Sequence, residues 1–188
     1  MMEKKEMRKM VKGQIKTILP EQRIALSKII SEKVFDRLKD IPATKVALFL
    51  SMSDEVDTSH LIHLLIKQGK HTVLVPRVED DTTINFYKLG NIEEYDTSGF
   101  GIKEPTDDIS EALVPEVMIV PGVAFDLYGG RLGRGRGYYD RYFKRFSEVI
   151  KLRLAIAYQL QVMVNHLPME PFDQRMDMLL TEENSYTF

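Results

Sequence analysis

Stretches in which apolar residues recur at a helical spacing alternate along this chain with short, continuous apolar runs. A four-residue spacing predicts a helix over roughly residues 21–39, because residues so spaced fall on one helical face. Its apolar stripe consists of Leu26, Ile30, Val34 and Leu38. Residues 2–18 have a basic amphipathic pattern and predict a helix that ends near Pro20. A further helix is predicted over residues 58–68, with Gly69 at its C-terminal cap.

Short apolar runs between the helical patterns are rich enough in apolar residues to be buried strands. They cover residues 45–51, 71–76, 82–89, 117–120, 152–158 and 178–181. A last helix is predicted over residues 137–146, after a glycine-rich loop. Strands that alternate with helices are typical of an α/β protein with a mostly parallel sheet. The chain shows no internal repeat and no separating linker, so we expect one domain over residues 1–188.

The composition is that of an ordinary globular protein, with 188 residues of which 44% are hydrophobic and 29% charged. The absence of Cys excludes disulfides, zinc-thiolate sites, iron–sulfur clusters and a cysteine nucleophile. No apolar run approaches the ~18 residues that a membrane helix needs. The start of the chain is too charged to be a signal peptide. We therefore expect a cytoplasmic protein with no membrane partner.

Charge is unevenly distributed, although the formal net charge is only −2. Residues 1–20 hold six Lys and Arg against two Glu, and residues 129–145 hold six against one Asp. Two basic segments on an otherwise acidic chain favour a local anion site over a broad nucleic-acid surface. For the first segment alone, a solvated helix face is the simpler explanation.

The most informative stretch is residues 121–143, which read PGVAFDLYGGRLGRGRGYYDRYF. Its glycines lie within nine residues and are Gly129, Gly130, Gly133, Gly135 and Gly137. They are interleaved with Arg131, Arg134 and Arg136. Glycines let backbone N–H groups approach an anion, the following helix N-terminus adds partial positive charge, and arginines supply forked donors for phosphate oxygens. The stretch therefore predicts a polyphosphate cradle between a strand and a helix.

This loop differs from the common phosphate-binding motifs. It contains no G-x-x-x-x-G-K-[ST] sequence, and its glycine spacing is not that of the dinucleotide fingerprint. Asp140 follows on the first helical turn, where it could hold Mg²⁺ beside phosphate oxygens or only complement the helix dipole. RNA binding through the RGRG run is a third interpretation, but such tracts are long and disordered. His60 and His63 have no evident third ligand, so we expect surface or packing roles for them.

The stretch from Pro121 to Asp126 and the run from Gly130 to Asp140 resemble the signature of the 5-formyltetrahydrofolate cyclo-ligase family, also called methenyltetrahydrofolate synthetases. Shorter matching pieces follow the family's order and are Lys4–Arg8, Ser53–Thr58, Gly99–Pro105 and Met176–Glu182. The resemblance spans nearly the whole chain. The chain departs from the pattern at Arg136, where many relatives carry Gly or Lys, and at Phe172, where we would expect His.

The resemblance implies an ATP- and Mg²⁺-dependent ligase of one-carbon metabolism. Such an enzyme closes 5-formyltetrahydrofolate to 5,10-methenyltetrahydrofolate and releases ADP and phosphate. ATP phosphorylates the formyl oxygen, and N10 then attacks the activated carbon. This chemistry asks mainly for positioning and charge stabilisation, and it needs no nucleophilic side chain. The lack of Cys and of a G-x-S-x-G elbow agrees with it.

The resemblance also implies roles for individual residues. ATP would be bound by Lys4, Lys5, Glu6, Met7, Arg8, Arg131, Leu132, Gly133, Arg134, Gly135, Arg136, Gly137, Tyr138 and Tyr139. Reduced folate would be bound by Arg8, Leu50, Glu55, Arg134, Gly135, Arg136, Gly137 and Tyr138. The catalytic residues would be Arg134 and Lys4, and the Mg²⁺ ligands Asp140 and Asp177. An ordinary core position explains Leu50 at least as well, and helix packing explains one of the two tyrosines.

By the same resemblance, the fold is a single three-layer α/β/α domain like those of sugar isomerases and CoA transferases. Folate and ATP should meet at the C-terminal ends of the parallel strands, where loops 51–58 and 126–137 converge. The expected partners are ATP and reduced folate, with or without a polyglutamate tail, and the expected state is a monomer that binds no nucleic acid. Two rivals stay open, namely a sugar-phosphate isomerase on the same fold and an RNA-binding module. The acidic connection 91–116 could move as a lid or simply form turns.

Overall fold

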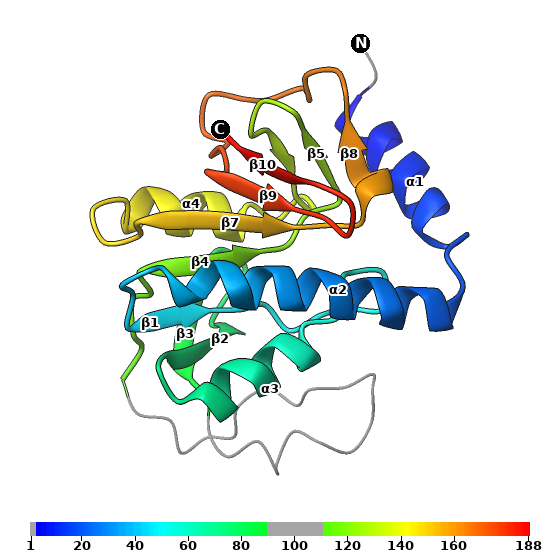
Figure 1. Cartoon of the computed structure of the whole chain (residues 1–188). Helices are drawn as coiled ribbons and strands as arrows, with labels where there is room; N and C mark the ends of the chain where they lie inside the picture. Colours follow the sequence, from blue (N-terminus) through cyan, green and yellow to red (C-terminus); the bar gives the residue numbers. More distant parts are fainter. Residues whose placement is uncertain (1–2, 90–110) are drawn as a thin grey trace.

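The computed structural model describes residues 3–89 and 111–188 (Figure 1). Within these residues, seven strands form the main sheet in the order β10-β9-β7-β4-β1-β2-β3. Their bounds are β1 Lys45–Ala47, β2 Thr72–Val78, β3 Ile84–Lys88, β4 Val117–Val120, β7 Leu152–Ile156, β9 Met178–Leu180 and β10 Ser185–Thr187. The five inner strands are parallel, and the edge strands β10 and β3 pair antiparallel. The α/β architecture with a mostly parallel sheet is therefore confirmed.

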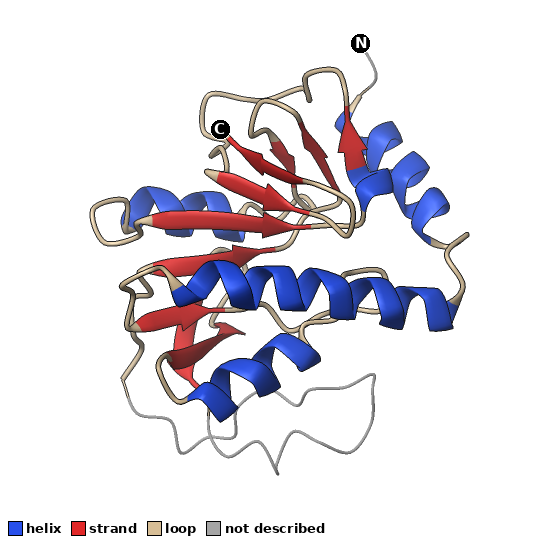
Figure 2. Ribbon diagram, in the orientation of Figure 1, coloured by secondary structure: helices blue, strands red, loops and turns tan. Residues whose placement is uncertain are grey.

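Helices cover both faces of this sheet and make three layers (Figure 2). The helices are α1 Lys4–Ile15, α2 Pro20–Lys39, α3 Ser59–Gln68 and α4 Tyr138–Arg145. In the view of Figure 1, α2 and α3 lie in front of the sheet and α4 lies behind it. The predicted cap at the end of α3 is present, with Gly69 left-handed at φ 67°. None of the described helices is long and apolar enough to cross a membrane.

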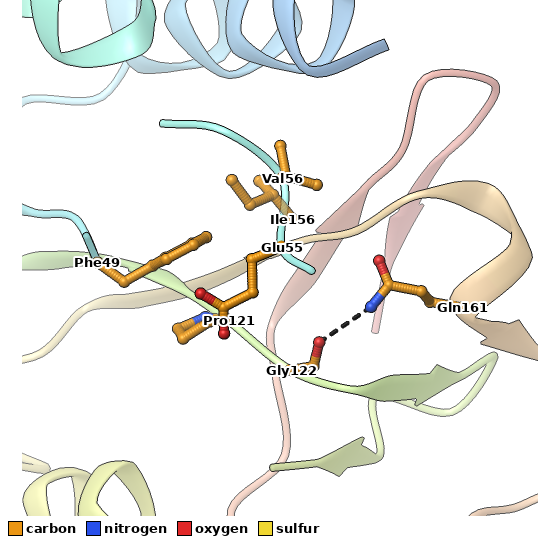
Figure 3. Close-up of a pocket in the computed structure, with 7 residues that line it drawn as sticks. All are labelled: Phe49, Glu55, Val56, Pro121, Gly122, Ile156 and Gln161. Carbon is orange, nitrogen blue, oxygen red and sulfur yellow. Dashed lines mark hydrogen bonds between the residues drawn. The ribbon is translucent and has the colours of Figure 1, made fainter. Parts of the chain in front are cut away.

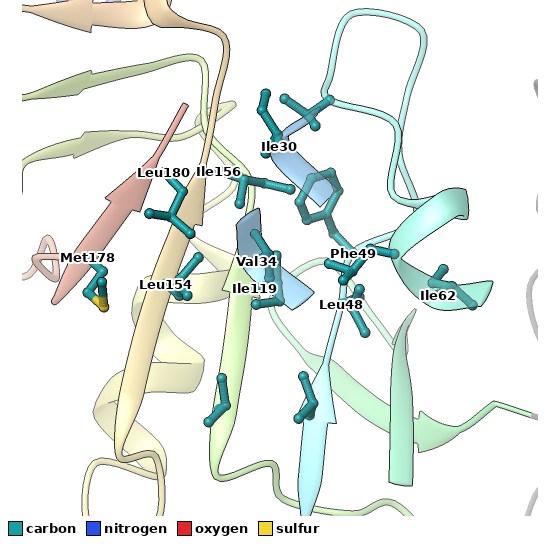
Figure 4. Close-up of a cluster of buried hydrophobic side chains, with 14 of the residues drawn as sticks. Ile30, Val34, Leu48, Phe49, Ile62, Ile119, Leu154, Ile156, Met178 and Leu180 are labelled. Carbon is teal, nitrogen blue, oxygen red and sulfur yellow. The ribbon is translucent and has the colours of Figure 1, made fainter. Parts of the chain in front are cut away.

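The core has two parts, because successive residues of a strand point to opposite faces of the sheet. Ile119 and Leu154 face α2 and α3, where they pack with Ile30 and Val34 of the predicted helical stripe (Figure 4). The other face packs against α4. Its buried residues include Ala47, Met118, Ala155, Phe86, Tyr142 and Phe143. The strands are buried on both faces, which explains why they were visible as continuous apolar runs.

A second, small sheet lies beside the main one and was not predicted. Within the described residues its strands are β5 Ala124–Asp126, β6 Arg131–Leu132 and β8 Val162–Met163, in the order β6-β5-β8. A short 3₁₀ helix, Gln159–Gln161, precedes β8. Strands of two or three residues are too short to show an alternation of apolar and polar positions. This sheet supports the start of the glycine–arginine loop, by which we mean residues 129–137. The loop passes through β6 and then leaves the sheet.

One predicted strand is shorter in the structure, and the direction of another was not predicted. The run 45–51 forms a strand only to Ala47; it was apolar beyond that point because Leu48 and Phe49, which follow the strand, are also buried in the core. Strand β3 pairs antiparallel with β2, since the few residues between them allow a hairpin but no crossover. Asp80 closes that hairpin by accepting the backbone N–H groups of Thr82 and Thr83. Most of the connection 91–116, including the proposed lid, lies outside the described residues.

Candidate functional site

Two loops that are far apart in sequence meet at the carboxyl ends of the parallel strands. Arg134 of the glycine–arginine loop donates through Nε to Glu55 Oε1 at 2.9 Å. Its Nη2 forms an ion pair with Asp54, and Lys12 of α1 lies 3.7 Å from the same carboxylate. The expected convergence of loops 51–58 and 126–137 is present, and Arg134 is the residue that joins them.

This cluster is charged at neutral pH. Burial alone would raise the pKa of Asp54, but its hydrogen bonds and charge attraction to Arg134, with help from Lys12, hold that pKa below the usual value. Burial likewise opposes the charge of Arg134, and the two carboxylates more than compensate, so its pKa is raised. Arg134 therefore stands at the mouth of the site between two carboxylates, with Lys12 beside one of them.

A small hollow of about 160 Å³ of empty volume lies beneath Glu55 (Figure 3). Its lining residues are Phe49, Glu55, Val56, Pro121, Gly122, Ile156 and Gln161. Gln161 fixes one wall by donating from Nε2 to the carbonyl oxygens of Gly122 and Val123, both at 3.0 Å. Glu55 is held from its own loop as well, because its Oε2 accepts the backbone N–H of Met52 at 2.9 Å. Leu50 is half-buried and packs on the main core.

The glycines of the loop are needed for its path. Gly129, Gly135 and Gly137 have φ of 80°, 105° and 68°, in the left-handed region that residues with a side chain rarely adopt. Gly130 has a different reason, since a Cβ there would collide with the carboxylate of Asp126. That fully buried carboxylate accepts the backbone N–H of Gly130 at 2.7 Å and two further backbone N–H groups. Asp126 is thus the anchor of the loop.

Helix α1 brings the first basic segment to this loop. Arg8 donates through Nε to the carbonyl oxygen of Gly133 at 2.7 Å, and its guanidinium also lies beside Gly135. Lys4 is turned to the C-terminal part of the chain, where its Nζ contacts Glu170 at 2.6 Å and Asp173 at 2.7 Å. Burial would lower the pKa of Lys4, but hydrogen bonds to these two carboxylates raise it. The two basic segments therefore form one surface, joined at Arg8.

The remaining residues of α1 that were expected to bind ATP divide by exposure. Lys5 and Glu6 are exposed, and Met7 is partly buried against the main core. Of these three, Met7 thus has a packing role in the structure.

The far end of the loop is built around a buried arginine. The side chain of Arg131 is 4% exposed, and its Nη2 donates to Asp140 Oδ2 at 2.8 Å. Its Nη1 donates to the carbonyl oxygen of Pro121 at 3.2 Å. Its Nε has no partner among residues 3–89 and 111–188. The second oxygen of Asp140 accepts the backbone N–H of Gln174 at 3.0 Å. Arg131 and Asp140 thus tie the loop to the start of α4.

The two expected metal ligands stand in different environments. Asp177 precedes β9, at the amino end of that strand, and Arg153 engages both its carboxylate oxygens, with Nη2 to Oδ1 at 2.7 Å. Asp140 follows the glycine–arginine loop on the first turn of α4. Among the described residues, no three His, Asp or Glu side chains lie together as a metal-binding group. An all-protein metal cage is therefore not part of the described structure.

The last residues of the loop turn toward the opposite face of the sheet. Leu132 is buried in the core, and Arg136 is exposed. The Tyr138 hydroxyl donates to the carbonyl oxygen of Asp80 at 3.2 Å. Tyr139 packs edge-on against Phe86, and burial raises its pKa. Tyr139 is the tyrosine that helix packing explains, whereas Tyr138 lies at the surface of the site.

Several residues of the site were not singled out from the sequence. They are Asp54, Asp126, Gln161, Glu170 and Asp173. Asp54 stands beside Glu55 in the same acidic loop, and Asp126 ends the PGVAFD stretch, so both carried a signal. The other three carried none, because their partners lie on distant parts of the chain.

Comparison with known proteins agrees with this geometry. The profile of the 5-formyltetrahydrofolate cyclo-ligase family matches residues 1–182. The mouse 5-formyltetrahydrofolate cyclo-ligase is 30% identical, over 96% of this chain and 94% of its own length. The Escherichia coli K12 enzyme of that name is 29% identical over 87% of this chain and 92% of its own. The solved structure of Aquifex aeolicus 5,10-methenyltetrahydrofolate synthetase superposes with a TM-score of 0.75 and 35% identity, covering 99% of this chain and 93% of that one.

Proposed function

The chain belongs to the 5-formyltetrahydrofolate cyclo-ligase family, and on that premise we propose that it closes 5-formyltetrahydrofolate to 5,10-methenyltetrahydrofolate at the expense of ATP. The observation that carries the proposal is the junction between Arg134 and Glu55. It places a phosphate-type loop directly against the acidic loop expected to hold the pterin. We further propose that residues 1–188 act as one catalytic unit, as a cytoplasmic monomer that binds no nucleic acid.

The chemistry explains why the site is rich in fixed cations and has no nucleophile. The formyl oxygen of the substrate is an amide oxygen and a poor leaving group. It attacks the γ-phosphorus of ATP, the bond to the β-phosphate breaks, and ADP leaves. N10 then attacks the activated formyl carbon, N10 loses its proton, and the C–O bond breaks to release phosphate. Arginine forks stabilise the charge on the transferring group, which is the main catalytic demand of phosphoryl transfer.

The geometry supports a triphosphate between α1 and the glycine–arginine loop. Arg8 already contacts Gly133, and Lys4 lies on the same helix one turn earlier. Lys4 reaches a phosphate by exchanging its two carboxylate partners for phosphate oxygens. Backbone N–H groups near Gly135 and the N-terminus of α4 add partial positive charge. Arg134 and Lys4 are therefore proposed as the cations that act on the transferring phosphoryl group.

The pterin is proposed to bind at the hollow beneath Glu55. Small-molecule sites typically have volumes of roughly 300–1,000 Å³, whereas this hollow leaves almost no room for a water-sized molecule, so it has to widen. Both oxygens of Glu55 are engaged, by Arg134 and by Met52. Release of Arg134 frees one oxygen for an N–H donor of the pterin and opens the mouth. We propose that Leu50, in the segment after β1, contributes apolar contact to the pterin.

The residues present fit Mg²⁺ only if ATP supplies most of its ligands. Mg²⁺ is commonly held by one or two carboxylates plus substrate phosphates, and it neutralises the charge that develops on them. Asp140 fits that role, since it stands beside the loop, and Mg²⁺ would share its carboxylate with Arg131. Asp177 can join it only after Arg153 releases it. We therefore propose Asp140 as the principal protein ligand.

The proposed function is tested by near-ultraviolet absorbance of the purified protein with 5-formyltetrahydrofolate, Mg²⁺ and ATP. The conjugated methenyl product absorbs where the substrate does not. The expected result is a rise that requires all three components and is abolished by a chelator. A folded protein that gives no rise would refute the cyclo-ligase activity. Thermal unfolding with and without Mg²⁺ and ATP separates the alternatives. A cyclo-ligase should be stabilised by about 2.7 kcal/mol when ATP is present at 100 times its Kd, whereas a phosphate-binding isomerase or an RNA-binding module should not be stabilised by ATP.

A further inference from the structure

A second hollow lies on the α4 face of the sheet, between α4 and the turn that joins β2 to β3. It contains about 450 Å³ of empty volume. The residues that form its polar lining are Thr82, Thr83, Tyr138, Arg141, Tyr142 and Arg145. None of the last three is among the expected ATP, folate or metal residues. We call this hollow the α4 groove.

The α4 groove is cationic. Arg141 and Arg145 are four residues apart, so they lie on one face of the helix. Arg145 is exposed, with its guanidinium 4.7 Å from the centre of the Phe146 ring. Its five N–H donors form a fork that matches a carboxylate. Burial raises the pKa of Tyr142, so its hydroxyl stays neutral at physiological pH.

Arg141 fixes the shape of the groove. Its Nε donates to the carbonyl oxygen of Thr82 at 2.8 Å, and its Nη2 donates to the carbonyl oxygen of Arg136 at 2.8 Å. It therefore ties the hairpin to the end of the glycine–arginine loop. Asp80 Oδ1 accepts hydrogen bonds from Thr82 and Thr83 of its own turn, and within the described residues it forms no ion pair with Arg141 or Arg145. Arg145 is consequently the cation of the groove with the most donors available to a ligand.

The α4 groove continues the proposed active site. Tyr138 belongs to both, since it ends the glycine–arginine loop and lines the groove. The helix from Tyr138 to Arg145 is roughly 10 Å long at 1.5 Å per residue. Arg134 contacts Glu55, and Tyr138 follows it in the loop, so a folate with its pterin at Glu55 that ran along this loop would have its other end at α4. That end is a glutamyl group with two carboxylates.

We propose that the α4 groove binds the glutamyl carboxylates of the folate substrate, with Arg145 as the principal contact and Arg141 as its support. The proposal rests on the proposed function, because it concerns the far end of the same substrate. Tyr138 would contact the aminobenzoyl ring between the two ends. The groove would also accept further glutamates in a polyglutamate tail, since its mouth is open to solvent at Arg145. Arg145 then determines substrate affinity and takes no part in the chemical step.

The experiment compares 5-formyltetrahydrofolate with 5-formyltetrahydropteroate, which lacks the glutamyl group. Both are assayed with the wild type, Arg145→Ala, Arg145→Lys and Lys144→Ala. Lys144 is an exposed lysine on the same helix that does not line the groove, so its variant is the matched charge control. We expect Arg145→Ala to raise KM for the glutamyl substrate roughly tenfold, which is about 1.4 kcal/mol, with kcat unchanged. Arg145→Lys should recover part of the loss.

The KM values for the pteroate and for ATP distinguish this proposal from its alternatives. In Arg145→Ala, KM for the pteroate and KM for ATP should both equal those of the wild type. An equal rise for both folates, a rise for ATP instead, or no rise for the glutamyl substrate would each overturn the proposal. Calorimetric Kd values for the two folates are measured on the same proteins. They test the groove even if the wild type shows no turnover, an outcome that would refute the proposed function separately.

Discussion

Arg134 and Glu55, 79 residues apart in the sequence, are joined by a hydrogen bond of 2.9 Å from Nε to Oε1. The guanidinium that should stabilise a phosphoryl group is therefore held by the carboxylate that should recognise the pterin. While this pair is intact, Arg134 is not fully available to a phosphate, and Glu55 is not fully available to a pterin. We therefore expect that binding of one substrate prepares the site for the other, because releasing Arg134 from Glu55 frees both side chains at once.

Arg134→Ala is expected to lower kcat/KM by about 100- to 1,000-fold, the usual cost of removing one group that stabilises transition-state charge. Stability should change little, because Arg134 is in a partly exposed loop and such ion pairs contribute about 1 kcal/mol or less. The initial rate of methenyl formation measures the first effect, and thermal unfolding measures the second. Arg37→Ala, which removes an exposed arginine from α2, is the control. Unchanged turnover in folded Arg134→Ala would contradict the phosphate cradle.

The Mg²⁺ requirement should separate the two aspartates. Asp140→Asn is expected to raise the Mg²⁺ concentration for half-maximal rate about tenfold, which corresponds to about 1.4 kcal/mol of binding. Asp177→Asn should lower the melting temperature, since it disturbs the contacts to Arg153, and leave the Mg²⁺ titration within about twofold of the wild type. The measurement is the rate as a function of Mg²⁺ at saturating ATP. A shift for Asp177→Asn alone would move the metal site to Asp177.

The main sheet could be predicted from the sequence because its strands are buried on both faces. Val117–Val120 was predicted with its observed bounds, since the run is apolar at every position. The small sheet could not be predicted, because its two- and three-residue strands carry no periodic signal. The antiparallel direction of β3 could not be predicted either, because the apolar pattern predicts that a strand forms and not which strand it pairs with.

The site was predictable where function requires an unusual residue type. Glycines at positive φ and interleaved arginines mark the loop, and Glu55 stands in an acidic loop after a strand. Pairing was not predictable, because it depends on which distant loops the fold brings together. The contact of Lys4 with Glu170 spans 166 residues, and no local pattern indicates it.

Asp126→Asn is expected to destabilise the protein and impair the loop together. The replaced oxygen would become an NH₂ group facing backbone N–H donors, so at least one buried donor would lose its acceptor. We expect the free energy of unfolding to fall by about 1–3 kcal/mol. Chemical denaturation measures the loss, and KM for ATP should rise because the loop is no longer fixed. Asp36→Asn, at an exposed position on α2, should change neither quantity. A wild-type unfolding curve for Asp126→Asn would refute the anchor role.

Glu116 should make stability depend on pH in the acid range. Its hydrogen bonds from Thr44, first the hydroxyl and then the backbone N–H, lower its pKa from the ordinary 4.5 to about 2. The unfolded chain binds a proton near pH 4.5 and the folded chain only near pH 2, so the stabilisation is complete above the higher value. It is lost progressively as the pH falls from about 4.5 to about 2.

Glu116→Gln is therefore expected to lower the melting temperature at pH 7 by about 2–4 °C, the change that roughly 1 kcal/mol causes in a chain of this size. The difference from the wild type should shrink through that acid window and vanish below about pH 2, where both side chains are neutral. Thermal unfolding between pH 2 and pH 7 provides the measurement. Lys151→Ala is the control, because Lys151 Nζ lies 3.4 Å from Glu116 in an exposed pair that contributes little. A difference that stays constant across the window would mean that Glu116 acts by packing and not by its charge.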